Sequence, residues 1–156
     1  MRALSLFSTA VLLVTSLQVS AATADQSWSC VRDERATALR SKNSRTDESP
    51  ITGLKIEIKD AQLVDGQITG WENADWKFTE PSPSGRNDPS FEAVLETKRS
   101  SGETVVVSIN SDSWDHYNYT VRLNTRTGQA TVDEAIQQDC RNPASGVAVL
   151  NCQRSQ

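Results

Sequence analysis

The feature of this chain that most constrains its fold is a strict alternation of apolar and polar residues. Residues 117–124 read YNYTVRLN, so two tyrosines, a valine and a leucine share one face while polar residues share the other. Apolar residues also stand at every second position in LKIEIK at 54–59, in FEAVLE at 91–96 and in VVVSI at 105–109. Because successive side chains of a strand point to opposite faces, each segment predicts a β-strand with one buried and one solvated face.

Residues typical of turns separate these segments. Asp65-Gly66 predicts a tight hairpin turn, because glycine readily adopts the positive φ that such a turn needs. The segment NTRTG at 124–128 predicts another hairpin turn, with its glycine in the left-handed position. By composition, SKNSRTDESP at 41–50 and TEPSPSGRNDPS at 79–90 are expected to be loops.

The strands and turns together define the fold class. We also expect a first strand at 28–31 and a last strand at 147–150, which gives seven or eight short strands joined by local turns. The sequence therefore predicts a mainly β protein, an antiparallel β-meander that forms a small barrel or a sandwich.

One segment near the C-terminus has helical spacing. Thr131-Val132-Asp133-Glu134 matches a capping box, and Val132, Ile136 and Cys140 lie four residues apart. We therefore expect one short helix at 133–140.

The first 24 residues have the layout of a secretory signal peptide. Arg2 precedes the apolar run AVLLV at 10–14, and Ala22-Thr23-Ala24 is an A-x-A cleavage site, with Val19-Ser20-Ala21 as an earlier alternative. The unbroken apolar core is shorter than the roughly 20 residues that a membrane-spanning helix needs. We therefore expect residues 25–156 to form a single β-rich domain in the periplasm or outside the cell.

Three cysteines, Cys30, Cys140 and Cys152, follow this segment. An exported protein can form disulfides, and three cysteines allow one intramolecular bond. We favour Cys30–Cys152, which would join the first strand to the last, with Cys140–Cys152 as the local alternative. In the chain-entropy model, a loop as long as the one between Cys30 and Cys152 contributes roughly 4–5 kcal/mol.

Composition and motifs argue against several classes of protein. The formal net charge is −4 with acids and bases interspersed, so the chain has neither a basic patch for nucleic acid nor a polybasic face for membranes. It contains no phosphate-binding glycine motif, no C-x-x-C pair and only one histidine. We therefore expect no cofactor and no metal, and a partner that is another protein or a small ligand.

The most pointed chemical signal is SDSWDHYNYT at 111–120, which holds the chain's only histidine just after a tryptophan and two aspartates. A Ser-His-Asp or Cys-His catalytic unit would have to use this histidine, but no G-x-S-x-G motif supplies a nucleophile. A tryptophan on a turn either covers a barrel end or contacts a partner. Arg86 would present a cation at the tip of the long loop. The candidate binding residues are therefore Asp112, Trp114, Asp115, His116 and Arg86.

A second group of acids and aromatics is WENADW at 71–76. Glu72 and Asp75 could serve as paired carboxylates acting on a glycoside. We favour the simpler interpretation, a turn with solvated acids between two strands whose tryptophans point inward.

Trp28-Ser29-Cys30 near the start of the expected domain and Cys152 near its end resemble the ends of bacterial envelope inhibitors of lysozyme, which are small β-barrels. The resemblance covers only these ends and carries over no functional residue. It implies, as an alternative function, inhibition of an envelope or extracellular hydrolase through a loop. Our main expectation is an exported β-domain that binds another molecule without catalysis, and a small hydrolase using His116 is a further alternative.

Overall fold

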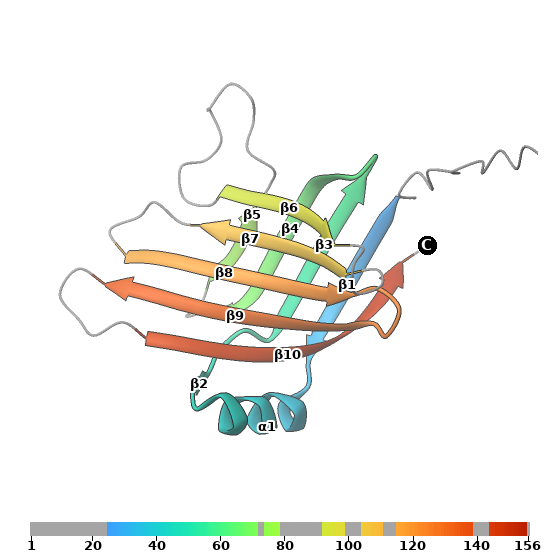
Figure 1. The fold of residues 1–156 in the computed structure, drawn as a ribbon. Helices are drawn as coiled ribbons and strands as arrows, with labels where there is room; N and C mark the ends of the chain where they lie inside the picture. Colours follow the sequence, from blue (N-terminus) through green and yellow to red (C-terminus); the bar gives the residue numbers. More distant parts are fainter. Residues whose placement is uncertain are drawn as a thin grey trace, which may run out of the picture.

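The computed structural model describes residues 25–71, 74–78, 92–98, 104–110, 115–138 and 144–155. These residues form ten strands and one helix (Figure 1). In chain order the elements are β1 Gln26–Arg32, α1 Glu34–Ser44, β2 Asp47–Glu48, β3 Gly53–Lys59, β4 Gln62–Trp71, β5 Ala74–Phe78, β6 Glu92–Lys98, β7 Thr104–Asn110, β8 Asp115–Asn124, β9 Gln129–Gln138 and β10 Ala144–Ser155.

Nine of the strands form a nearly closed antiparallel barrel, which confirms the predicted fold class. Their order is β5-β4-β3-β1-β10-β9-β8-β7-β6, and the short β2 pairs in parallel with β10. Neighbours in the barrel follow one another along the chain, except that the first and last strands, β1 and β10, pair with each other. This pairing turns an open meander into a barrel whose seam lies between β5 and β6 (Figure 1).

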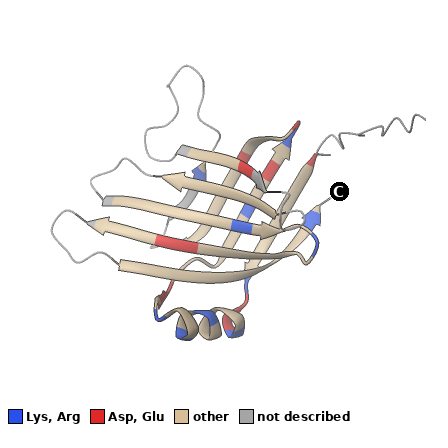
Figure 2. Cartoon of the chain, in the orientation of Figure 1, with Lys and Arg blue, Asp and Glu red and all other residues tan. Residues whose placement is uncertain are grey.

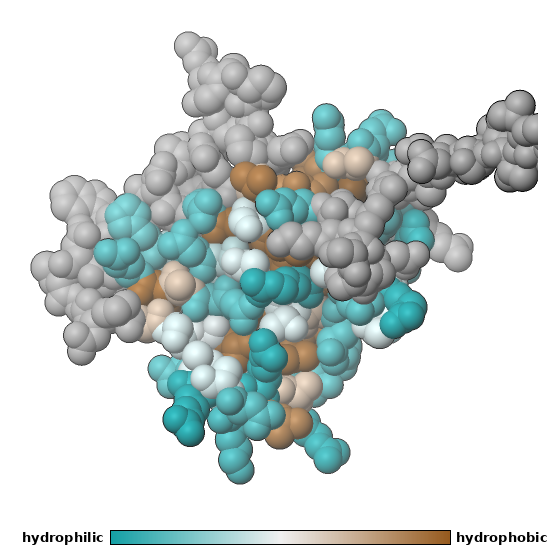
Figure 3. All heavy atoms as spheres, in the orientation of Figure 1, coloured by the Kyte–Doolittle hydropathy of each residue, from teal (hydrophilic) through white to brown (hydrophobic). Residues whose placement is uncertain are grey.

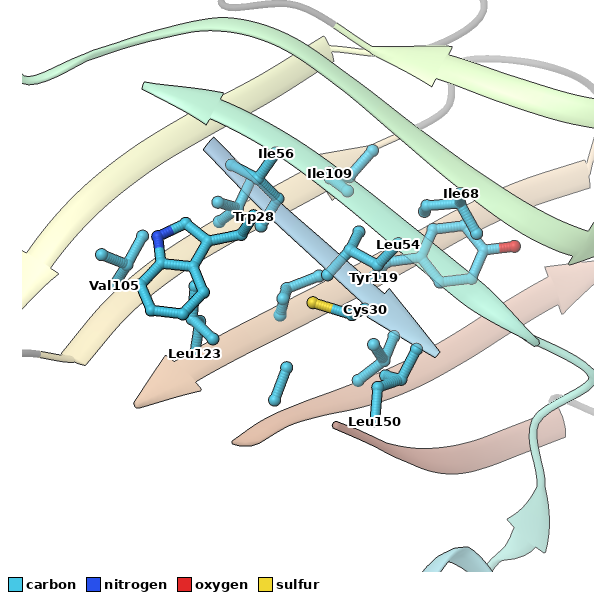
Figure 4. Close-up of a cluster of buried hydrophobic side chains, with 14 of the residues drawn as sticks. Trp28, Cys30, Leu54, Ile56, Ile68, Val105, Ile109, Tyr119, Leu123 and Leu150 are labelled. Atoms are coloured by element: carbon cyan, nitrogen blue, oxygen red, sulfur yellow. The ribbon is translucent and has the colours of Figure 1, made fainter. Parts of the chain in front are cut away.

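The alternating residues divide between the inside and the outside of the barrel as predicted. Tyr119, Val121 and Leu123 of β8 are buried, while Arg122 between them is exposed. All nine barrel strands contribute to one contiguous apolar cluster, in which side chains from different strands converge (Figure 4). Each fully buried aliphatic side chain in such a core is worth about 1.5–3 kcal/mol relative to exposure.

The disulfide between Cys30 and Cys152 joins the two terminal strands, as favoured from the sequence. The two cysteines occupy directly opposed positions on β1 and β10, and both belong to the core cluster. The bond therefore links the two strands whose pairing closes the meander. Cys140 lies outside the described residues.

The one helix in the described part of the chain is α1, and the helix expected at 133–140 is wrong for residues 133–138. These residues belong to β9, where Val132 and Glu134 face inward while Ala135 is exposed. The observed helix α1 starts at the Asp33 N-cap, whose side chain accepts a hydrogen bond of 2.9 Å from the Ala36 amide. It covers the first part of the segment at 41–50 that we expected to be a loop.

Helix α1 lies outside the barrel wall beside β10 (Figure 1), and its exposed side is mostly hydrophilic (Figure 3). Its only buried residue is Thr37, whose hydroxyl donates to the Val149 carbonyl and accepts from the Val149 amide. The apolar run at 147–150 is therefore buried on both faces. Ala148 and Leu150 face the core, and Val147 and Val149 are covered from outside.

The first hairpin turn differs from the prediction. Asp60 and Ala61 form the turn between β3 and β4, with φ values of 50° and 63°. Asp65-Gly66, expected to be a turn between strands at 62–64 and 67–71, instead lies within the single strand β4, just after a bulge in its pairing with β3. A Cβ at Gly66 would come within 2.0 Å of the Phe78 ring, so glycine is needed there for packing.

The second hairpin turn is confirmed. It joins β8 to β9, and Gly128 has a φ of 66°. The Asn124 side chain accepts hydrogen bonds of 3.0 Å from the amides of Arg126 and Thr127, which stabilises this turn locally.

None of the helices in the described part of the chain is long and apolar enough to cross a membrane.

Candidate functional site

The sequence-predicted binding residues fall in three groups. Asp112, Trp114 and Arg86 lie outside the described residues. Asp115 is the first residue of β8, and its side chain is likewise outside the description. His116 follows it on β8 and is exposed on the outer face of the barrel.

The surroundings of His116 can be followed through the strand register. His116 is opposed by Gln137 on β9, and the next residues on the same face are Asn118 and its partner Ala135. Within these described positions, His116 has neither a carboxylate nor a nucleophilic side chain beside it. The hydrolase alternative would therefore depend on residues outside the described part of the chain.

A buried acid, Glu134, is the most unusual side chain in the described structure, and sequence reasoning missed it. Glu134 lies on the inward face of β9 and is only 4 % exposed. It is opposed by Tyr119 on β8 and by Gly146 on β10. Burying a carboxyl among apolar side chains is costly unless it is hydrogen-bonded, so its partners decide its role.

Two hydroxyl groups bind the carboxyl of Glu134, those of Tyr119 and Ser49. Both of these residues are themselves buried, with 2 % and 1 % exposure. We call Ser49, Tyr119 and Glu134 the Glu134 cluster. The glycine at 146 makes room for it, since a Cβ there would lie 3.1 Å from both Glu134 Oε2 and the Ser49 backbone.

The surroundings of Glu134 shift the pKa of its carboxyl upward. Burial raises the pKa of Glu134, and the hydrogen bonds from Ser49 and Tyr119 only partly offset that rise. Burial, followed by the charge of Glu134 and the hydrogen bond to it, raises the pKa of Tyr119. A carboxyl held neutral can donate one hydrogen bond and accept others.

One oxygen of the cluster is left without a partner. Glu134 Oε1 is buried and has no hydrogen-bond partner among the described residues. Leaving a buried acceptor unpaired costs about 1–3 kcal/mol, so native proteins rarely keep one without a reason.

Arg32 holds Ser49 in place against Glu134. The Arg32 side chain is 9 % exposed, and its Nη1 donates to the Ser49 carbonyl and, at 3.3 Å, to the Ile51 carbonyl. Its remaining donors reach Glu48 at 2.6 Å and Glu34 at 2.7 Å. One guanidinium thus positions the segment that leads from β2 into the core, where Ile51 is fully buried.

The Glu134 cluster can be placed relative to the end of the barrel at which β8 begins. β8 begins at Asp115, opposite Gln138 of β9, and Glu134 lies four residues before the end of β9. β4 ends and β5 begins at this same end, so the backbone of Trp71 and Ala74 from the WENADW segment also lies there. We call it the Glu134 end of the barrel.

No group of three or more metal-ligating side chains occurs among the described residues. No protein-family model matches the chain, and no curated protein and no solved structure is significantly similar to it. The function must therefore be inferred from the chain's own geometry.

The sequence carried one signal for Glu134. Once 129–138 is treated as a strand, a glutamate stands in the inward row between Val132 and Ile136, where an apolar residue is expected. Its spacing with Thr131 instead matched a capping box, and the helical interpretation hid the anomaly.

Proposed function

We propose that this chain is an exported, non-catalytic binding domain and that it receives a hydrogen-bond donor of its ligand at Glu134. The observation that carries the proposal is the buried, unpartnered Oε1 of Glu134. A donor supplied by a ligand would recover the free energy that this orphan acceptor costs the protein. The disulfide between the terminal strands fits an oxidising compartment, in keeping with export to the periplasm or the exterior.

The chemistry of the cluster favours a particular kind of ligand group. An amide can donate to Oε1 while the carboxyl stays neutral, and an ammonium or amidinium can do so while the carboxyl ionises. The interior beyond the cluster is filled by apolar side chains from all nine barrel strands. A ligand is therefore expected at the Glu134 end of the barrel.

Binding explains the cluster better than turnover does. Of the two hydroxyls that bind Glu134, that of Tyr119 has a raised pKa, so its phenolate is not readily available as a base or nucleophile. The hydroxyl of Ser49 would need a general base to activate it. The only histidine is exposed on the outer face of β8, whereas Glu134 is on the inner face of β9. A measured turnover that is lost on His116→Ala with the fold intact would contradict this proposal.

The test compares two amide substitutions at neighbouring positions of β9. Glu134→Gln keeps the shape of the side chain and removes the acid group. Asp133→Asn makes the same change one residue earlier, at an exposed ion pair with Arg122. Thermal unfolding of the oxidised chain 25–156 is measured with benzamidine, butylamine and propionamide as probes.

We expect at least one probe to raise the unfolding temperature of the wild type and of Asp133→Asn in a saturable way. The same probe should raise the unfolding temperature of Glu134→Gln by less. A glutamine cannot ionise to pair with a cationic probe, and its own amide group is a donor that takes the place of the probe's donor. Equal shifts in all three proteins, or no shift with any probe, would contradict a ligand at Glu134.

The inhibitor alternative rests on the loop at 81–89, which lies outside the described residues, and it stays a prediction. Its test is direct. Deleting 81–89 should abolish inhibition of a lysozyme while leaving thermal unfolding nearly unchanged, and unaltered inhibition would count against the loop.

A further inference from the structure

A polar groove of about 460 Å³ lies on the outer face of the barrel, across β1, β3, β4 and β5. Its floor includes Trp28, Ile56 and Gly66, which are buried in the barrel wall. The side chains around it point outward, so the groove is separate from the Glu134 cluster on the inside. It reaches the end of β10 at Ser155.

The strand register arranges the groove in two rows that run across the strands. The first row is Ser155, Ser27, Glu57 and Asp65, which oppose one another in turn on β10, β1, β3 and β4. The second row is Ser29, Lys55, Gln67 and Lys77 on β1, β3, β4 and β5. The first row is therefore acidic and the second basic, and β3 carries acidic and basic residues close together (Figure 2).

The hollow follows from the size of these side chains. On β1 the outward residues within the groove are the short Ser27 and Ser29, whereas the neighbouring strand β3 carries the long Lys55 and Glu57. Short side chains beside long ones leave a depression along β1.

The basic row is free to bind a ligand. Lys55 and Lys77 are both exposed, and within the described structure neither forms an ion pair or a side-chain hydrogen bond. They lie on either side of Gln67, on strands whose backbones are about 10 Å apart, so both can lean toward a group placed over the amide.

The acidic row has an unfavourable internal arrangement. Glu57 and Asp65 are directly opposed carboxylates, and such like-charge pairs destabilise a sheet. Lys59 pairs with Glu57 at 2.8 Å, and the Gly66 amide donates to Asp65 at 2.9 Å, but no cation bridges the two acids among the described residues. A cationic group placed over both would relieve their repulsion.

We propose that this groove binds a zwitterionic ligand, whose anionic group lies over Lys55, Gln67 and Lys77 and whose cationic group lies over Glu57 and Asp65. The two rows are two residues apart along each strand, so the ligand's charges must be separated by about 7 Å. A simple anion or a polyanion would meet the acidic row, which repels it. The chemical class is therefore a short chain with an amine at one end and a carboxylate at the other, such as a small peptide with free termini.

The probe for the test is 6-aminohexanoate, which spans that separation when extended. Hexanoate and hexylammonium each carry one of its charges and serve as ligand controls. Backbone amide NMR shifts of the oxidised chain 25–156 are followed during titration with each compound. We expect saturable shifts at Ser29, Lys55, Gln67 and Lys77 with 6-aminohexanoate, and at least fivefold weaker binding of hexanoate and of hexylammonium.

Charge reversal provides the protein controls. Lys55→Glu and Lys77→Glu are each expected to weaken 6-aminohexanoate binding by about fivefold, because each removes one exposed ion pair and puts a like charge in its place. Lys42→Glu makes the same change of net charge on α1, outside the groove, and should leave binding unchanged. The proposal is overturned if no saturable shift occurs, if hexanoate binds as tightly as 6-aminohexanoate, or if Lys42→Glu weakens binding as much as Lys55→Glu.

Discussion

The hydroxyl of Tyr119 is hydrogen-bonded to the carboxyl of Glu134 across directly opposed positions of β8 and β9, inside an otherwise apolar barrel. The two groups have different effects on one another. The hydrogen bond lowers the pKa of Glu134, whereas the charge of Glu134 raises the pKa of Tyr119. Burial raises the pKa of Glu134 by more than its hydrogen bonds lower it. The carboxyl of Glu134 therefore keeps its proton to higher pH than an exposed glutamate would.

This relationship predicts how stability depends on pH. The folded-state pKa of Glu134 is raised above its ordinary value of 4.5, so the folded chain holds a proton that the unfolded chain has lost above that pH. Stability should therefore fall as pH rises from about 4.5 to the folded pKa, by up to about 1.4 kcal/mol per pH unit, and then level off. In urea unfolding between pH 4 and 8, the wild type should lose stability relative to Glu134→Gln over this range.

The control for that pH profile is Asp133→Asn on the same strand. It makes the same acid-to-amide change at an exposed ion pair with Arg122, and so controls for the substitution itself. Parallel profiles for the wild type and Glu134→Gln would show that Glu134 titrates normally.

The disulfide yields a second prediction. Peptide mapping of the oxidised chain should recover Cys30 linked to Cys152 and leave Cys140 as the free thiol. Replacing Cys30 and Cys152 by serine should lower the free energy of unfolding by about 2–5 kcal/mol, because the bond closes a very long loop between the two terminal strands. A recovered Cys140–Cys152 peptide would refute the pairing.

A third prediction concerns two glycines that sit in the barrel wall. Gly66→Ala places a Cβ within 2.0 Å of the Phe78 ring, which is fixed in the core, so we expect a loss of about 2–3 kcal/mol. Gly146→Ala meets its nearest atoms only at 3.1 Å and should cost less. Denaturant unfolding of both variants compares the two losses in free energy of unfolding. If Gly66→Ala loses no more than Gly146→Ala, the Phe78 ring can move to make room for the added Cβ.

The antiparallel β-meander was predictable from the sequence, with a barrel and a sandwich both open, because strict alternation of apolar and polar residues favours strands over helices. A segment such as 117–124 buries its apolar residues only as a strand, and several such segments with local turns close most simply into a meander. The segment after Val132 could not be assigned in this way. Positions four residues apart lie on one face of a helix, but they also share a face of a strand, so Val132 and Ile136 fit both.

Helix α1 and the Glu134 cluster could not be predicted, because long-range contacts determine them. Helix α1 has no apolar stripe, and its place is set by Thr37 bonding the backbone of Val149. Likewise, nothing in the sequence around Glu134 shows that Ser49 will reach it from a different part of the chain. Local composition predicted the strands, and tertiary packing produced the site.

The contacts of Arg32 lead to a last prediction, that this one side chain holds the segment that covers Glu134. Arg32→Ala removes the donors to the carbonyls of Ser49 and Ile51 and leaves both without their side-chain partner, at a cost of about 1–3 kcal/mol. Hydrogen exchange measured by mass spectrometry should then become faster in residues 49–52, while exchange in β7 and β8 changes little. Arg154→Ala is the matched control, because Arg154 is exposed and, among the described residues, its side chain bonds only the Asp25 carbonyl. If exchange in 49–52 is the same in Arg32→Ala as in Arg154→Ala, the backbone bond from Ser49 to Val147 holds the segment without Arg32.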